Sequence, residues 1–433
     1  MKLSSKFDVI EWGYYLLVAF AVGLPEVLSL SLDTVRNYMT ILSACILALS
    51  IPVVALNKSR LSKSSFFYLG ALILCIIFGV FRAHKLYHYS LNNMFYALRQ
   101  YVWIFLYFPV LYIFKAKDYN MIKALGNVLT ILNISLLFRT LTWAMYTLAR
   151  IEIFPTILRE FGDLWYRNES SIRIDGTPLI MVGVLISVYL YFKLRKAKYL
   201  VSTFYILLYI LIVNQTRVLV FSILVSVFFM YLAVHRDSKI TPKKLVTYTV
   251  IIVSVFVVSI YGYRFFMQNS RASDMGIGYR YWELNYYLSL LSDGNWKSGL
   301  GILTATNPRS YAVLYGHWDT RMYLDDLGIF ELFFQFGLVS IFMYGYLVWK
   351  TIQIYGKYHR EEDRIEKALL IGLASYLVLT AVSLNAYGIQ RSFSLSIILA
   401  ILFFLEQRYV ENLVLKSKGC SIEDNLYSNF KLQ

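Results

Sequence analysis

This chain of 433 residues has little charge. Asp, Glu, Lys and Arg together make up only 16% of it, whereas about a quarter is usual for a soluble domain. Apolar residues make up 58% of the chain, and the mean hydropathy is +0.56. Apolar runs of about 20 residues recur from end to end, and this is the length of a helix that crosses a bilayer. The scarcity of charge excludes a soluble protein and predicts an all-α, polytopic integral membrane protein.

Cysteine and histidine are also scarce. Cys45 and Cys75 lie inside apolar runs and Cys420 lies in the tail, so no disulfide framework is indicated. The five histidines are scattered, which argues against a zinc site, and we expect neither a metal nor a cofactor. The N-terminal stretch "MKLSSKFDVIEWGYY" leads into a full apolar run without a short apolar core and a small-residue cleavage site. A cleavable signal peptide is therefore not expected.

The apolar runs predict twelve transmembrane helices in a single membrane domain, residues 1–433. The predicted spans are 11–30, 37–56, 65–82, 100–115, 121–149, 177–193, 199–213, 216–234, 246–263, 326–349, 367–386 and 392–411. Two loops on the side opposite the termini are long, 150–176 and 264–325. Loops of this length are often functional. The segment 82–100 has apolar residues at helical spacing and predicts a helix lying along the membrane surface.

The net charge of +16 could suggest nucleic acid as a partner, but basic loops on the cytoplasmic side explain it more simply. The side with the termini carries 19 Lys and 6 Arg, and the opposite side carries 2 Lys and 14 Arg. Short basic loops place the termini in the cytoplasm. Arg binds phosphate bidentately, so the Arg-rich outer side suggests an anionic ligand there. The alternative is that Arg packs well near the membrane interface.

Two single arginines are candidates for substrate contact. Arg217 opens the eighth span in "NQTRVLVF", where it could point at a lipid-borne phosphate or serve as an interfacial anchor. Arg139 lies inside the fifth span, ten residues from its outer end, or about 15 Å at the helical rise. An Arg at that depth is costly and should face an internal cavity or a partner, although a structural ion pair would also satisfy it.

The stretch "DMGIGYRYWELNYYLSLL", residues 274–291, predicts an amphipathic helix in the second long loop, preceded by Gly276 and Gly278. Its Arg280 and Glu283 could pair on one face of the helix. Trp282 and the neighbouring tyrosines could instead form a surface on which sugars stack. The following glycines, in "SGLGI", lack the setting of a nucleotide-binding motif.

Ionisable residues crowd the mouth of the tenth span in "YGHWDTRMYLDDLGIFELFFQFGLVSIF", residues 315–342. These residues are His317, Asp319, Arg321, Asp325 and Asp326. Acidic residues at a helix N-terminus have a plain explanation in the helix dipole. A carboxylate or imidazole beside arginines also suits glycosyl transfer from a lipid diphosphate, because one group deprotonates the attacking hydroxyl while cations stabilise the leaving diphosphate.

The order of these pieces resembles the O-antigen ligase and polymerase superfamily. An Arg opens a span in "QTRVLVF", an outer loop holds "GYRYWELNYYLSLL" and "SGLGI", and a polar residue opens a span in "DDLGIFELFFQFGLVSIFMYGYL". The similarity covers about 214–349, roughly a third of the chain. It implies a metal-independent membrane glycosyltransferase with a fold like the glycosyltransferase C type, acting on undecaprenyl-diphosphate-linked oligosaccharide. It places this activity at the outer face of the bacterial cytoplasmic membrane.

By motif position, Arg217 and Arg280 match the family's arginines, and Asp326 stands where ligases commonly carry His. The resemblance therefore favours a Wzy-type polymerase of O-antigen, capsule or exopolysaccharide, with Asp326, Arg217 and Arg280 catalytic. Arg139, Arg321, His317, Asp325 and Trp282 are expected to bind substrate. A chain-length regulator protein is a further expected partner, besides the lipid bilayer, and nucleic acid is not expected. The alternatives are a ligase with the same donor, and a flippase or other transporter of lipid-linked oligosaccharide.

Overall fold

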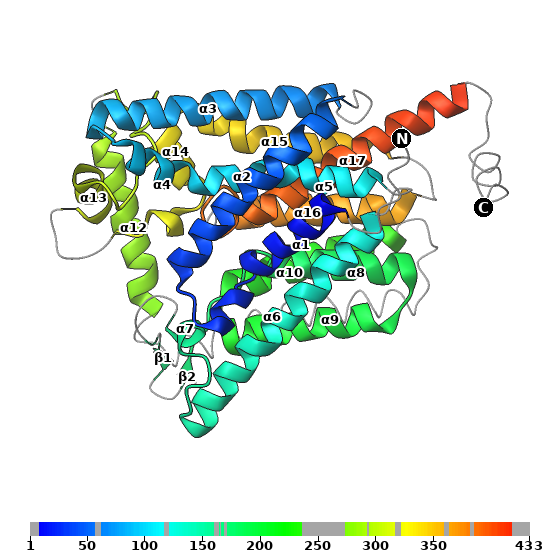
Figure 1. Cartoon of the computed structure of the whole chain (residues 1–433), viewed down its shortest axis with the longest axis horizontal. Coiled ribbons are helices and arrows are strands. Elements are labelled where there is room, and N and C mark those ends of the chain that lie inside the picture. The colour runs from blue at the N-terminus through cyan, green and yellow to red at the C-terminus, as the bar shows by residue number, and fades with distance from the viewer. Residues whose placement is uncertain are drawn as a thin grey trace.

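The computed structural model describes residues 8–56, 62–116, 121–159, 164, 166–168, 171–235, 273–291, 294–316, 322–358, 363–381 and 385–417. This part of the chain is almost wholly helical (Figure 1). The helices are α1 (Val9–Ala21), η1 (Leu24–Leu28), α2 (Leu32–Leu56), α3 (Lys63–Tyr87), α4 (Leu91–Val102), η3 (Trp103–Leu106), α5 (Tyr107–Ala116), α6 (Met121–Ala149), α7 (Pro155–Leu158), α8 (Ile180–Leu194), α9 (Ala197–Leu208), η4 (Tyr209–Asn214), α10 (Arg217–His235), α12 (Ser273–Leu290), α13 (Pro308–Tyr315), η5 (Leu324–Leu327), α14 (Ile329–Phe336), α15 (Val339–Lys357), α16 (Arg364–Thr380) and α17 (Ser392–Ser417). Two short antiparallel strands, β1 (Tyr166–Asn168) and β2 (Ser171–Ile172), interrupt the first long loop.

Within the described residues, six helical stretches are long and apolar enough to cross a membrane. They are Leu32–Val54, Lys63–Tyr87, Leu91–Lys115, Met121–Ala149, Ala197–Asn214 and Ser392–Glu411. Val9–Ala21, Ile180–Leu194 and Leu219–His235 are shorter apolar helices. These helices fit a multi-pass membrane protein, as the sequence predicts. The predicted ninth span, 246–263, lies outside the described residues.

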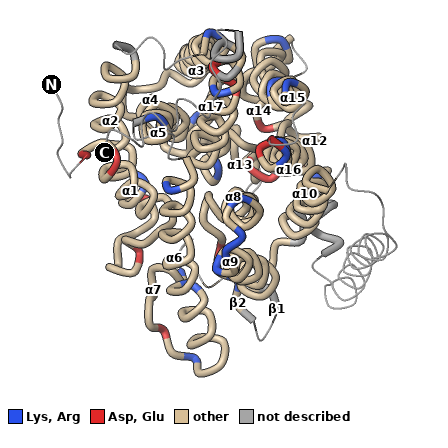
Figure 2. Tube along the Cα trace, turned by 90° about the vertical axis from the view of Figure 1, so that its right-hand side faces the viewer, with Lys and Arg blue, Asp and Glu red and all other residues tan. Residues whose placement is uncertain are grey.

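The long helices lie side by side and run between two ends of the molecule (Figure 1). At one end, here called the terminal end, α1 begins and α17 finishes. At the other, here called the loop end, α12, α13 and the β1–β2 hairpin gather. Figure 2, seen from the terminal end, shows most helices end-on and few charged residues along them. The termini-bearing side and the long loops are therefore on opposite sides of the helical layer.

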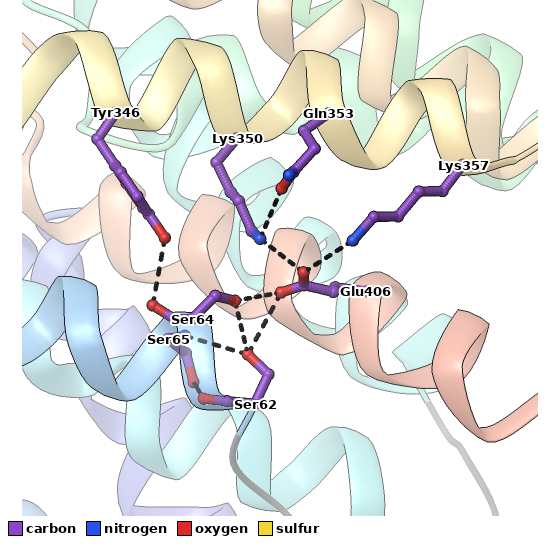
Figure 3. A network of polar contacts seen from close by, with 8 residues as sticks. All are labelled: Ser62, Ser64, Ser65, Tyr346, Lys350, Gln353, Lys357 and Glu406. Atoms are coloured by element: carbon purple, nitrogen blue, oxygen red, sulfur yellow. Dashed lines mark hydrogen bonds and ion pairs between the residues drawn. The ribbon is translucent and has the colours of Figure 1, made fainter. Parts of the chain in front are cut away.

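A buried polar network joins α3, α15 and α17 at the terminal end (Figure 3). Lys350 Nζ lies 2.6 Å from Glu406 Oε1, and Lys357 Nζ lies 3.3 Å from the same oxygen. Ser62 and Ser64, where α3 begins, donate hydrogen bonds to the other carboxylate oxygen. Lys350 and Glu406 are both less than a tenth exposed. A charge pair that is buried and fully hydrogen-bonded can fix how these helices pack.

Two predicted elements at the loop end are corrected by the structure. The surface helix expected at 82–100 is wrong, because α3 runs on to Tyr87 and α4 continues through η3 into α5. A capping box between Ser90 and Asn93 starts α4, and between Val102 and Tyr107 the chain stays helical through the 3-10 turn η3. Gly276 and Gly278 also do not precede the amphipathic helix but lie inside α12.

The predicted span 326–349 is not one helix. A 3-10 turn, η5, is followed by the short helix α14, a break at Gly337 and the longer helix α15. Gly337 has φ +61° and ψ −140°, a region that only glycine adopts readily. The first predicted span, 11–30, is also broken, at Gly23, which takes the left-handed conformation (φ +74°, ψ +23°). Both breaks lie at the loop end.

Candidate functional site

At the break at Gly337, residues 297–301, a non-helical segment of the second long loop, form backbone hydrogen bonds with the end of α14 and with Leu338. Leu338 N donates to Lys297 O (3.2 Å), Leu300 N to Phe334 O (2.7 Å) and Gly301 N to Gln335 O (2.9 Å). The end carbonyls of α14, which a helix leaves without partners, are thereby satisfied. A Cβ on Gly299 would lie 2.4 Å from Gln335 O, so the two backbones approach too closely for any side chain there. These backbone contacts hold the 297–301 segment against the C-terminal end of α14.

The arginine of α12 and the aspartate of η5 come together at the loop end. Arg280 Nη2 lies 3.8 Å from Asp326 Oδ2, and their side chains are 44% and 51% exposed. An exposed pair of this kind contributes about 0–1 kcal/mol to stability. Both groups can therefore turn to a ligand at small cost. The pairing of Arg280 with Glu283 that the sequence allowed is not formed, because Glu283 turns inward.

Glu283 anchors the segment that carries Asp326. Glu283 is 2% exposed, and its Oε1 accepts a hydrogen bond from Tyr323 N (2.8 Å). Burial raises the pKa of Glu283, the nearby charge of Asp326 raises it further, and the hydrogen bond from Tyr323 and the charge of Arg280 lower it. The role that the structure gives Glu283 is to hold η5 against α12.

Arg391 is a residue that the sequence analysis missed. It directly precedes α17 and is half-buried, and its guanidinium makes no hydrogen bond or ion pair with any residue that the structure describes. Burial lowers the pKa of Arg391, while the charges of Asp175 and Asp326, among others, raise it. A half-buried cation without a direct counterion is costly in the chain alone. Such a group marks a place where an anion could be held.

Glu331 of α14 was also missed, although a carboxylate in the apolar run "IFELFFQF" is a strong signal. It is 3% exposed. Asn385 Nδ2 donates to its Oε2 (3.0 Å), and Gln335 Nε2 donates to its Oε1 (3.1 Å). Gln335 in turn accepts a hydrogen bond from Tyr101 (3.4 Å). This buried chain of polar groups connects α4, α14 and the turn before α17.

Arg139 occupies a second polar region. Its Nη2 lies 2.8 Å from Glu26 Oε2, with both side chains almost fully buried, and its Nη1 donates to Asp175 O (3.2 Å). Arg139 also lines a cavity between η1, α2, η3, α6 and the residues before α8 and α17. Both expectations for this residue thus hold: it makes an ion pair, and it faces a cavity. Glu26, which pairs with it, was not singled out in the sequence.

Several of the arginines on the side opposite the termini form hydrogen bonds within the protein. Arg82 Nη2 donates to Asn295 Oδ1 (2.6 Å), Arg99 Nη1 to Asn37 Oδ1 (3.1 Å) and Arg173 Nη2 to Thr216 Oγ1 (3.0 Å). Packing therefore explains part of the excess of Arg over Lys on this side. Among the described arginines, Arg280 pairs with Asp326 at the loop end, and Arg36 lines the cavity of Arg139.

The other predicted site residues are placed as follows. Asp325 lies with Asp326 in η5, and both side chains are exposed. Trp282 is 41% exposed on α12, whereas Tyr287 is buried and takes no part in any sugar-stacking surface. Arg217 is the first residue of α10, but the structure does not describe its side chain. His317 and Arg321 lie outside the described residues. Among the described residues, no three His, Cys, Asp or Glu side chains form a metal-binding group.

No protein-family model matches the chain, and no curated protein matches it either.

Proposed function

We propose that this protein is a membrane glycosyltransferase that polymerises undecaprenyl-diphosphate-linked oligosaccharide repeat units. In this proposal it has twelve spans and a fold like the glycosyltransferase C type. It acts at the outer face of the bacterial cytoplasmic membrane. The observation that carries the proposal is the meeting of Arg280 and Asp326 at the loop end. The charge of Asp326 also raises the pKa of Arg391, although burial lowers it more.

The chemistry follows from these groups. The acceptor hydroxyl oxygen attacks the anomeric carbon of the donor, and the bond from that carbon to the phosphate oxygen breaks. Asp326 takes the hydroxyl proton. The electron pair leaves with the lipid diphosphate, whose growing charge Arg280 and Arg391 stabilise. Arg217, at the start of α10, is proposed to bind the same diphosphate. Arg280 pairs with Asp326 in the free protein and moves to the diphosphate when donor binds, which frees the carboxylate.

The test is polymer formation by variants at these positions. Asp326→Asn should lower polymer formation by about 100-fold or more, the usual contribution of a general base, and single lipid-linked repeat units should accumulate. Arg280→Lys keeps the charge but loses the bidentate fork and should be similarly impaired. The matched control is Arg309→Lys, an exposed arginine of α13 at the same end. Normal polymer in both Asp326→Asn and Arg280→Lys would refute the proposal.

A transporter of lipid-linked oligosaccharide is the second candidate. The break at Gly337 and the buried Glu331 favour it, because transporters often place ionisable groups beside broken helices. The side of the membrane on which repeat units collect decides between the two functions. Trapping on the outer face in Asp326→Asn supports the polymerase, and trapping on the cytoplasmic face supports the transporter. A ligase would leave repeat-unit polymer intact but untransferred to its final acceptor.

A further inference from the structure

Two arginines that the proposed chemistry does not use, Arg36 and Arg99, come together where α2 begins. Asp33, Arg36 and Asn37 lie three and four positions apart in α2 and therefore share one side of that helix. Arg99 of α4 reaches this side, because its Nη1 donates to Asn37 Oδ1 (3.1 Å) and its Nη2 lies 3.6 Å from Asp33 Oδ1. Both helices begin at the loop end (Figure 1). Arg36 and Arg99, here called the α2–α4 arginine pair, thus bring two positive charges to one place at that end.

The two guanidinium groups are held differently. Arg99 is 7% exposed, and its guanidinium carbon lies 5.3 Å from the ring centroid of Tyr96, so α2 and α4 together fix its position. Arg36 is partly exposed, and no hydrogen bond or ion pair joins its side chain to any residue that the structure describes. The aspartate that contacts Arg99, Asp33, is 78% exposed, and a carboxylate so exposed pairs weakly and can turn to solvent. A ligand anion would therefore meet one fixed guanidinium group and one that is not engaged by the described chain.

The neighbouring charges do not neutralise this pair. Glu26, Arg139 and Asp175 line the same cavity as Arg36, but Arg139 is paired with Glu26 (2.8 Å), and Arg173 lies 3.5 Å from Asp175. Each of these two ion pairs is neutral. The α2–α4 arginine pair outnumbers its one aspartate by one charge, and Arg391, one residue beyond the cavity lining, adds another positive charge. The described charges around the start of α2 therefore favour an anion.

The surface next to the α2–α4 arginine pair indicates which anion this is. Guanidinium groups bind phosphate with two parallel hydrogen bonds, and α2 is long and apolar enough to cross a membrane. Continuing from Asn37 along the same side of α2, Ile41 and Leu49 are 57% and 51% exposed, and Cys45 between them is exposed too. This apolar stripe runs from the arginines into the depth of the bilayer, as the hydrocarbon chain of a lipid would. Basic pockets between membrane helices are known to bind lipid head groups.

We infer that Arg36 and Arg99 bind the phosphate of a membrane lipid at the loop end. A phosphate oxygen takes the place of Asp33 beside Arg99 Nη2, and Arg36 binds the same phosphate from the next turn of α2. Two sources share this chemistry, an anionic phospholipid of the bilayer and a polyprenyl-diphosphate-linked glycan. The site does not rest on the proposed function, although the second source would make it the place of a second lipid-linked substrate.

The test measures lipid binding by the full chain, purified in detergent, with native mass spectrometry. The probes are phosphatidylglycerol, farnesyl diphosphate, phosphatidylcholine and inorganic pyrophosphate. Phosphatidylglycerol, farnesyl diphosphate or both should bind more tightly than phosphatidylcholine. Arg36→Gln should weaken this binding at least about tenfold, the effect of one hydrogen bond to a charged group, whereas Asp33→Asn removes the competing carboxylate and should strengthen it. The matched control is Arg309→Gln, which removes the same charge from an exposed arginine of α13 at the same end and should bind like the native chain.

The probe whose binding depends on Arg36 identifies the source: phosphatidylglycerol indicates a bilayer phospholipid, and farnesyl diphosphate indicates a polyprenyl-linked lipid. Four outcomes would overturn the inference: neither lipid binds the native chain more tightly than phosphatidylcholine, Arg36→Gln and Arg309→Gln bind alike, Asp33→Asn binds no more tightly than the native chain, or pyrophosphate binds as tightly as the lipids. The assay is independent of transfer. Normal polymer in Asp326→Asn and Arg280→Lys would reject the polymerase and leave the lipid site standing, and polymerisation that depends on Asp326 in a chain without Arg36-dependent lipid binding would do the reverse.

Discussion

Replacing Gly337 with Ala should destabilise the loop end strongly. The residue has φ +61° and ψ −140°, and a side chain in this region costs about 1–3 kcal/mol. Its Cβ would also lie 2.5 Å from Lys297 O. The obstacle is backbone, so no rotamer change relieves it, and the 297–301 segment must move away from α14.

This movement lowers the free energy of unfolding, and the contacts that it disrupts set the size of the effect. It strains the three hydrogen bonds that Leu338, Leu300 and Gly301 donate between the two segments, each worth about 1 kcal/mol. Conformational strain and the three lost hydrogen bonds together give about 4–6 kcal/mol for Gly337→Ala. Gly345→Ala is the matched control. Gly345 lies in α15, and the methyl group of an alanine there would meet nothing within 4 Å. Gly→Ala inside a helix should stabilise by about 0.5–1 kcal/mol.

The assay is thermal unfolding of the detergent-purified full chain, with limited proteolysis to locate the opening. Gly337→Ala should unfold at a lower temperature than the native chain and be cleaved more readily in the 294–307 segment, while Gly345→Ala should do neither. Equal unfolding temperatures and equal cleavage for the two variants would refute the claim that the Gly337 contact holds the loop end together.

Three further predictions concern topology, pH and the terminal end. Reporter fusions at Asn295 and Lys357 should report opposite sides of the membrane, with Asn295 external, because the two residues belong to opposite ends of the helical layer; signals from the same side would contradict this. Burial raises the pKa of Glu283 above its ordinary 4.5, so the folded chain binds a proton on this carboxyl more tightly than the unfolded chain does. The stability of the fold should therefore fall as the pH rises from 4.5. In thermal unfolding, Glu283→Gln should lose less stability over the same pH rise than the native chain. Glu406→Gln leaves Lys350 buried without its counterion and should cost about 3–5 kcal/mol in unfolding, whereas Glu152→Gln, at the partly exposed pair with Arg159, should cost at most about 1 kcal/mol.

The sequence predicts the helices better than it predicts the site. Apolar runs mark α2, α3, α6 and α17 because crossing a membrane requires them to be long and apolar. The sequence predicts only that Arg280 and Asp326 lie on the same side of the membrane. It does not predict their contact, because the two residues are 46 positions apart in the chain. Glu331 could have been found from its apolar surroundings. Arg391 had a weaker signal, because an Arg at a span boundary is common as an anchor.

The breaks in the helices connect the fold to the candidate site. Irregular backbone at the depth of a membrane is tolerated where protein covers it or where it lines a cavity, and both breaks described above meet this condition. At Gly337 the 297–301 segment supplies the missing backbone partners. At Gly23 the chain turns into η1, where Glu26 pairs with Arg139 at the wall of the cavity. Uninterrupted helices would have been simpler to stabilise, and the terminal end is built from them. The polar groups that the proposed function uses, Asp326 and Arg391, lie beside irregular segments of the loop end. The proposed active site therefore lies where the helices are interrupted.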